Sequence, residues 1–111
     1  MPKLRINGHG HILPEPHEIP AFMKQKKLFW IDDDKGFMRQ GSWSRPITCQ
    51  SFFLDEKLAW MERQNIDHAV MLTLSQLYCN GFTEDDSYDT IRFQNDFNAN
   101  VQGHPSGQFT C

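Results

Sequence analysis

The N-terminal run reads Arg5-Ile6-Asn7-Gly8-His9-Gly10-His11, and it ends in two histidines that are two residues apart. In an extended strand, side chains two positions apart lie on the same face. We therefore expect a strand over residues 3–11, with Leu4 and Ile6 packed on hydrophobic neighbours and both histidines on the opposite face. Such a strand would present two imidazoles to a polar centre.

The paired histidines, His9 and His11, indicate a metal site. Neutral imidazole is a common ligand of zinc and similar divalent ions. The His-x-His spacing alone fits two solvated side chains on a loop equally well, and its place at the end of a predicted strand is what favours the metal. The other histidines are expected to be structural or exposed; these are His17, His68 and His104.

The second half of the chain is expected to alternate helix and strand. Apolar residues at helical spacing predict a helix over residues 55–65, with Asp55 as its N-cap. The apolar run 69–74 is typical of a strand that is buried on both faces. A second helix is predicted over residues 85–102, ending before Gly103. Two strands joined through a helix form a right-handed βαβ unit, so the expected fold class is α/β.

Between the first strand and the first long helix, residues 12–53 are expected to form an irregular insertion. Prolines at positions 14, 16 and 20 interrupt regular structure. A short helix is predicted over residues 21–29, and the segment 30–50 is expected to be irregular. Asp32 to Gly36 has the composition of a turn, with glycine at the position of positive φ.

A loop carrying Trp43 and Arg45 is expected within this insertion. Pro46 restricts Arg45 to extended geometry. An arginine fixed in this way can bind a carboxylate through two parallel hydrogen bonds. The alternative is an ordinary surface ion pair, and the residues alone favour that alternative.

Composition limits the classes of function. The chain has 111 residues and a formal net charge of −3, which fits one small domain and offers no concentrated basic face for nucleic acid. Its three cysteines, an odd number without Cys-x-x-Cys spacing, argue against a disulfide framework and for a reducing compartment. No apolar run approaches the ~20 residues that span a bilayer. We therefore expect a cytoplasmic protein without nucleic-acid or membrane partners.

The ordered set of motifs resembles the metal-dependent amidohydrolase superfamily, and within it the amidohydrolase-2 or aminocarboxymuconate-semialdehyde decarboxylase-like branch. The resemblance covers nearly the whole chain, through the opening run 6–15, the arginine loop 43–47, the helix and strand 58–70, and the later helix at 95–98. It implies that His9 and His11 bind a divalent metal, with zinc as the expected ion, and that Arg45 pairs with a substrate carboxylate. Asn7 stands where the family typically has an acidic residue, and its amide could still orient His9.

The family fold is a (β/α)₈ TIM barrel, which typically needs ~250 residues. The resemblance therefore implies that residues 1–111 form a single partial domain, the incomplete N-terminal part of such a barrel, with about two of its strands. The chain ends about where a third strand would begin, so we expect either a fragment or a truncated gene product. The catalytic acid or base is then expected beyond the chain.

The resemblance implies an enzyme that hydrolyses or decarboxylates a small carboxylate-bearing substrate with metal-activated water, and Arg45 tilts the choice slightly toward decarboxylation. One alternative is a catalytically inactive fragment that acts only through oligomer or partner contacts. Another is a small metal-binding module without catalysis. A homo-oligomer is expected, because two strands and their helices leave sheet edges and apolar faces uncovered.

Overall fold

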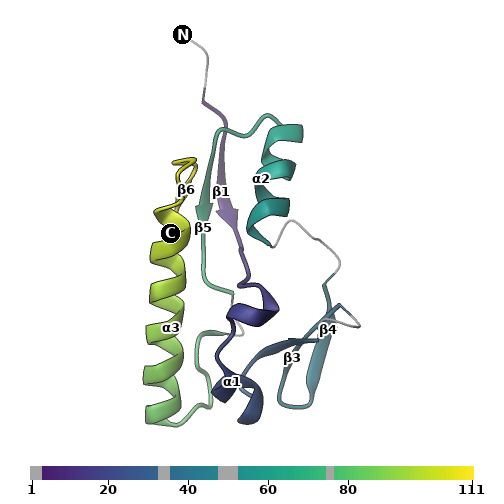
Figure 1. Ribbon diagram of the computed structural model, residues 1–111, viewed down its shortest axis with the longest axis vertical. Helices are drawn as coiled ribbons and strands as arrows, with labels where there is room; N and C mark the ends of the chain where they lie inside the picture. Colours follow the sequence, from purple (N-terminus) through teal and green to yellow (C-terminus); the bar gives the residue numbers. More distant parts are fainter. Residues whose placement is uncertain (1–3, 33–35, 48–52, 75–76) are drawn as a thin grey trace.

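The computed structural model describes residues 4–32, 36–47, 53–74 and 77–111 (Figure 1). Its elements in chain order are β1 (Ile6–Gly10), the 3₁₀ turn η1 (Pro16–Glu18), α1 (Ala21–Gln25), β2 (Trp30–Asp32), β3 (Phe37–Gln40), β4 (Trp43–Pro46), α2 (Leu54–Arg63), β5 (His68–Met71), α3 (Glu84–Gln102) and β6 (Phe109–Thr110). None of the helices in these ranges has the length and apolar character needed to cross a membrane.

A parallel sheet with the strand order β1-β5-β6 forms one end of the molecule. β1 pairs with β5 in the register Ile6 to His68 and Asn7 to Ala69, and β5 pairs with β6. The expected strand–helix–strand unit is therefore confirmed, with α2 between two parallel strands. The third strand, β6, begins where the sequence placed one.

Both long helices cover the same face of this sheet. Met61 of α2 and Phe97 and Val101 of α3 are buried in one cluster with Ala69 and Met71 of β5. These helical positions are the ones that the apolar spacing predicted to face the core. In Figure 1, α2 lies along the β1 edge of the sheet and α3 lies along the side of β5 and β6.

The start of each helix follows from its first residues. α3 begins after Thr83, whose hydroxyl accepts a hydrogen bond from the backbone N–H of Asp86 at 3.2 Å. α2 begins one residue earlier than predicted, after Phe53, and its N-cap makes no side-chain hydrogen bond. Asp55 therefore lies in the first turn, where a carboxylate favours the positive end of the helix dipole, and is not the N-cap.

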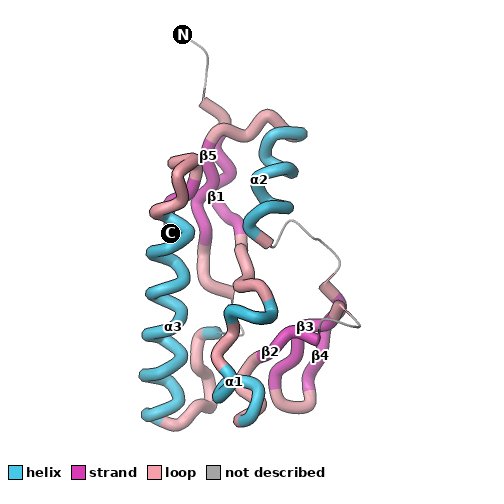
Figure 2. The backbone as a smooth tube through the Cα atoms, in the orientation of Figure 1, coloured by secondary structure: helices cyan, strands magenta, loops and turns pink. Residues whose placement is uncertain are grey.

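The segment expected to be irregular contains a second, antiparallel sheet in the order β2-β3-β4 (Figure 2). Gln40 pairs with Trp43, so Gly41 and Ser42 form a two-residue hairpin loop. Gly41 has φ 56°, which a turn with glycine at its first central position requires. The predicted turn at Asp32 is confirmed at its described ends, because the N–H of Gly36 bonds to the carbonyl of Asp32 at 2.9 Å.

This second sheet has a core of its own. Buried side chains from the segment between β1 and the end of β3 pack against a residue in the loop after β5. The buried residues of this core are Leu13, Met23, Leu28, Phe29, Met38 and Leu77. Two separate cores along a molecule of 50 × 28 × 21 Å explain its elongated shape. Prolines at positions 14, 16 and 20 still act as predicted, because only a single 3₁₀ turn forms between them.

The expectation of a partial TIM barrel is wrong at the level of architecture. The chain is a small α/β fold in which a three-stranded parallel sheet stands beside a separate three-stranded antiparallel sheet. Strands β2, β3 and β4, which lie within the irregular insertion expected over residues 12–53, build the antiparallel sheet and contribute to its core. The α/β class itself is retained.

One face of the parallel sheet carries exposed apolar side chains. Leu4 and Ile6, expected to pack on hydrophobic neighbours, are 75% and 59% exposed. The run after Ala69 was expected to be buried on both faces, yet Leu72 is 41% exposed. Both helices cover the opposite face, so the predicted burial was assigned to the wrong side of β1.

Candidate metal centre

The side chains of His9 and His11 lie next to each other at the carboxyl end of β1. Their ring centroids are 5.1 Å apart and their planes are perpendicular. Zn–N bonds of ~2.0–2.1 Å and a tetrahedral angle would place the centroids of two ligating imidazoles roughly 5 Å apart. His9 is exposed and His11 is half-buried, so both rings can be reached from solvent. The spacing is compatible with one shared ion.

The ring of His11 is held by the neighbouring strand. Its Nδ1 lies 3.0 Å from the carbonyl oxygen of Leu72, directly after β5. The backbone N–H of Leu72 in turn donates to the carbonyl of Gly10 at 2.7 Å. A neutral imidazole that donates through Nδ1 keeps its lone pair on Nε2, which is the arrangement commonly seen in histidine ligands of metals.

Asn7 does not orient a histidine ring as anticipated. Its side-chain oxygen accepts a hydrogen bond from the backbone N–H of His9 at 3.2 Å. The β1–β5 register shifts between Asn7 and Gly10, so strict alternation of faces fails in this part of the strand. Asn7 therefore supports the backbone that carries His9.

Within the ranges that the structure describes, no three His, Cys, Asp or Glu side chains group together as a metal site. His9 and His11 are thus a pair of candidate ligands, and the remaining positions around an ion would fall to water or to a second chain. Structural zinc sites normally have four protein ligands, whereas catalytic ones keep an open position.

The other histidines lie elsewhere and make local contacts. Nε2 of His68 lies 2.7 Å from the hydroxyl oxygen of Thr110 and joins β5 to β6. Nδ1 of His104 accepts from the backbone N–H of Ser106 at 3.1 Å. His17 is exposed in η1.

Arg45 lies on β4, opposite Met38 of β3, and not on a loop. Its extended conformation agrees with the restriction that Pro46 imposes. The side chain is exposed, and the structure brings it into no hydrogen bond or ion pair with a described residue. β4 belongs to the antiparallel sheet, so no contact links Arg45 to the two histidines.

Cys79 has the properties of an unreactive thiol. It is half-buried at φ 65°, and its Sγ lies 3.7 Å from the carbonyl oxygen of Leu77. Burial raises the pKa of the Cys79 thiol, which disfavours the thiolate that a nucleophile requires. Cys49 lies outside the described residues.

Lys57 is buried, although lysine is a residue type typical of the solvent side of a helix. It is 5% exposed, and its Nζ lies 4.6 Å from the centroid of the Trp60 ring. The signal was present, because Lys57 falls three residues after Leu54 and four before Met61, on the apolar stripe. Because lysine is usually exposed, the residue type argued against a position that the helical spacing assigns to the core.

The chain matches no protein-family model, and no curated protein matches it either. The resemblance to amidohydrolases therefore stays a prediction, and the geometry of the two histidines has to be argued from its own chemistry.

Proposed function

We propose that His9 and His11 bind a divalent metal ion, which the chemistry of the donors suggests is zinc. We also propose that the chain is part of a metal-dependent enzyme. The observation that supports this proposal is the contact between Nδ1 of His11 and the carbonyl of Leu72, which leaves Nε2 of His11 available to a ligand, while the ring of His9 lies 5.1 Å away. Imidazoles are typical zinc donors.

The reaction class follows from the resemblance described above. We propose hydrolysis or decarboxylation of a small carboxylate-bearing substrate. A divalent ion at this site supplies a Lewis acid and lowers the pKa of a bound water. Within the chain, the backbone around Leu72 fixes the tautomer of His11, and Asn7 holds the backbone of His9. Arg45 enters as the partner of the substrate carboxylate through the resemblance alone.

A titration with Zn²⁺ followed by calorimetry tests the metal site. We expect His9→Ala and His11→Ala each to weaken binding by about tenfold or more, because each removes one of two protein donors. His17→Ala is the matched control, since His17 is an exposed histidine in η1, outside the pair. Equal binding by all three variants would contradict the proposal.

Turnover is tested separately with a panel of small carboxylic acids, esters and amides in the presence of Zn²⁺. Release of CO₂ would identify a decarboxylase, and release of an alcohol or amine would identify a hydrolase. The His9→Ala variant is expected to abolish either activity. Metal binding without any turnover would leave the metal-binding module, without catalysis, as the function of this chain.

A second candidate function is binding to another protein chain without catalysis. Exposed apolar side chains on one face of the parallel sheet favour it, and they include Leu4, Ile6 and Leu72. Sedimentation velocity over a range of concentrations would detect self-association. If Ile6→Lys converts an oligomer into a monomer while Zn²⁺ binding is retained, the contact surface and the metal site are independent.

A further inference from the structure

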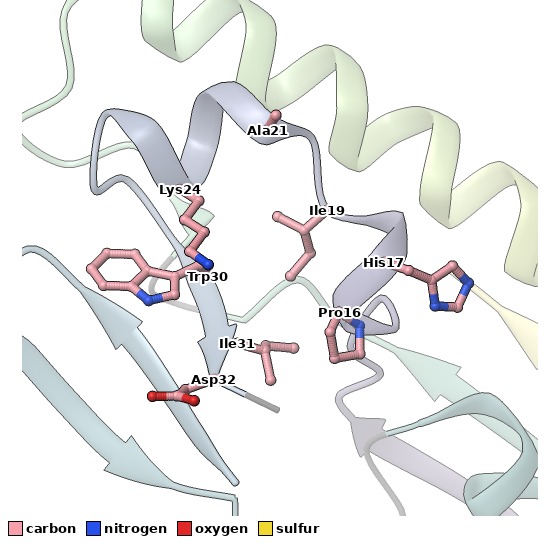
Figure 3. Close-up of a pocket in the computed structure, with 8 residues that line it drawn as sticks. All are labelled: Pro16, His17, Ile19, Ala21, Lys24, Trp30, Ile31 and Asp32. Atoms are coloured by element: carbon pink, nitrogen blue, oxygen red, sulfur yellow. The ribbon is translucent and has the colours of Figure 1, made fainter. Parts of the chain in front are cut away.

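A pocket of about 480 Å³ opens between η1, α1 and β2 (Figure 3). Its apolar side is formed by Pro16, Ile19 and Ile31, and the ring of Trp30 borders it. All four side chains are half-buried, so each keeps apolar surface that a ligand could remove from water. The hollow is large enough for a small organic molecule, and none of its lining residues belongs to β1.

The walls of this pocket are held by contacts that do not depend on a ligand. The backbone N–H of Glu15 donates to the Glu18 carboxylate at 2.9 Å, and the N–H of Glu18 donates back to the Glu15 carbonyl at 2.8 Å. These two bonds fix the turn η1. On the opposite wall, β2 is paired along its length with β3. The pocket is therefore largely preformed.

Among the charged residues that line the rim and that the structure describes, one cation has no described counterion. The carboxylate of Asp32 is neutralised by Arg39, with Nη2 at 3.1 Å and Nε at 3.3 Å from the same oxygen. Lys24 is exposed and makes no hydrogen bond or ion pair with any residue in the described ranges. In Figure 3 the amine of Lys24 lies between Trp30 and Ile19, whereas the ring of His17 points away.

We propose that this pocket binds a small organic carboxylate with a flat or aliphatic apolar body. The carboxylate pairs with the ammonium group of Lys24. The body lies against Ile19 and Ile31, with one edge at the Trp30 ring. A single uncompensated positive charge matches a monoanion, whereas sites for phosphate groups usually combine several cations or free backbone N–H groups.

This site does not rest on the proposed metal centre, because none of the residues that line it is His9, His11 or Arg45. The way in which the pocket forms explains why it could not be predicted from the sequence. Lys24 belongs to a lysine cluster typical of a solvated helix face, and it meets Trp30 only because the chain reverses between α1 and β2.

Fluorine NMR of the full chain labelled with 5-fluorotryptophan tests the proposal. The chain contains three tryptophans, Trp30, Trp43 and Trp60, and replacing each with Phe assigns the three signals. 2-Naphthoate is the probe, and 2-naphthamide is its neutral counterpart of the same shape. We expect naphthoate to shift the Trp30 signal selectively and to bind about fivefold more tightly than the amide, as one exposed ion pair allows.

Variants at the rim separate charge recognition from apolar contact. Lys24→Met is expected to weaken naphthoate binding about fivefold and leave naphthamide unaffected, while Lys24→Arg retains binding. Lys27→Met is the matched control, because Lys27 is exposed in the same cluster but does not line the pocket. His9→Ala is expected to change nothing, so failure of the metal site and failure of this site are distinguishable. A Trp30 signal that does not move, or equal affinity for both probes in the wild type, would overturn the proposal.

Discussion

A Cβ atom added to Gly10 would lie 2.6 Å from Cε of Met71 on the neighbouring strand β5. The same atom would lie 3.3 Å from Nδ2 of Asn7 and 3.3 Å from Nζ of Lys57. The carboxyl end of β1 is thus closely covered on one side, directly between the two candidate metal ligands. The absence of a side chain at Gly10 permits this approach of β5 and α2.

Replacing Gly10 tests this close approach. Relative to Gly8→Ala, Gly10→Ala is expected to lower the free energy of unfolding by up to about 1 kcal/mol, because the flexible methyl end of Met71 must move aside. Gly8→Ala is the matched control two residues earlier, where a Cβ would meet nothing within 4 Å. Urea denaturation measures both. An unfolding free energy that falls equally in the two variants would point to strand geometry and not to the Met71 contact.

The same chemical change at two threonines of the α3 region should have opposite effects. Thr90 is fully buried and its hydroxyl has no hydrogen-bond partner in the described part of the chain, so Thr90→Val is expected to raise the free energy of unfolding by about 1 kcal/mol. Thr83 caps the helix through Asp86, so Thr83→Val is expected to lower it by about 1 kcal/mol. Thermal unfolding of both variants measures the sign. A loss of stability at Thr90 would show that a water or other group satisfies the hydroxyl.

The β3–β4 hairpin depends on one backbone conformation. Gly41 has φ 56° and open space around its Cα, so Gly41→Ala is strained by conformation alone and is expected to lose about 1 kcal/mol of stability. Gly41→Asn tolerates positive φ and is expected to lose less. Denaturation followed at Trp43, which lies directly after the turn, measures the effect. Equal losses in the two variants would exclude backbone strain as the cause.

The elements that the sequence predicted well are those whose burial repeats over many residues. Phe97 and Val101 lie four residues apart on α3 and are buried as expected, because a helix of 19 residues repeats the same face several times. The parallel partnership of β1 and β5 also followed, since a helix between two strands leaves little choice of direction.

The antiparallel sheet was missed because its strands are three or four residues long. So few positions cannot establish a period of two, and the segment was expected to be irregular. The pair Gly41-Ser42 was the available signal, since glycine followed by serine between two short runs is typical of a two-residue hairpin loop. Once this hairpin forms, Arg45 stands on a strand and the presumed insertion becomes a second core.

The contact between His11 and Leu72 could not be predicted from spacing. The two residues are 61 positions apart in sequence. Their contact depends on the register of β1 and β5 and on the irregularity between Asn7 and Gly10. The alternation of faces predicted the proximity of the two rings. It failed for Ile6, because it does not say which face the helices cover.

The ion pair between Lys26 and Asp86 should make stability depend on pH at both ends of the scale. Nζ of Lys26 lies 2.7 Å from Oδ1 of Asp86 and ties the end of α1 to the first turn of α3. The hydrogen bond between them lowers the pKa of Asp86 and raises that of Lys26, which the charge of Asp86 raises further. The Asp86 contribution is therefore present above about pH 4 and lost as the pH falls through the lowered pKa of Asp86. The Lys26 contribution is lost above about pH 10, as the pH rises through the raised pKa of Lys26.

Lys26→Met is expected to be less stable than the wild type at neutral pH and equally stable near pH 2, as measured by urea denaturation across the range. Lys27→Met, which removes an exposed charge outside this pair, should show no such convergence, and a Lys26→Met deficit that persists undiminished in acid would mean that packing and not charge joins the two helices.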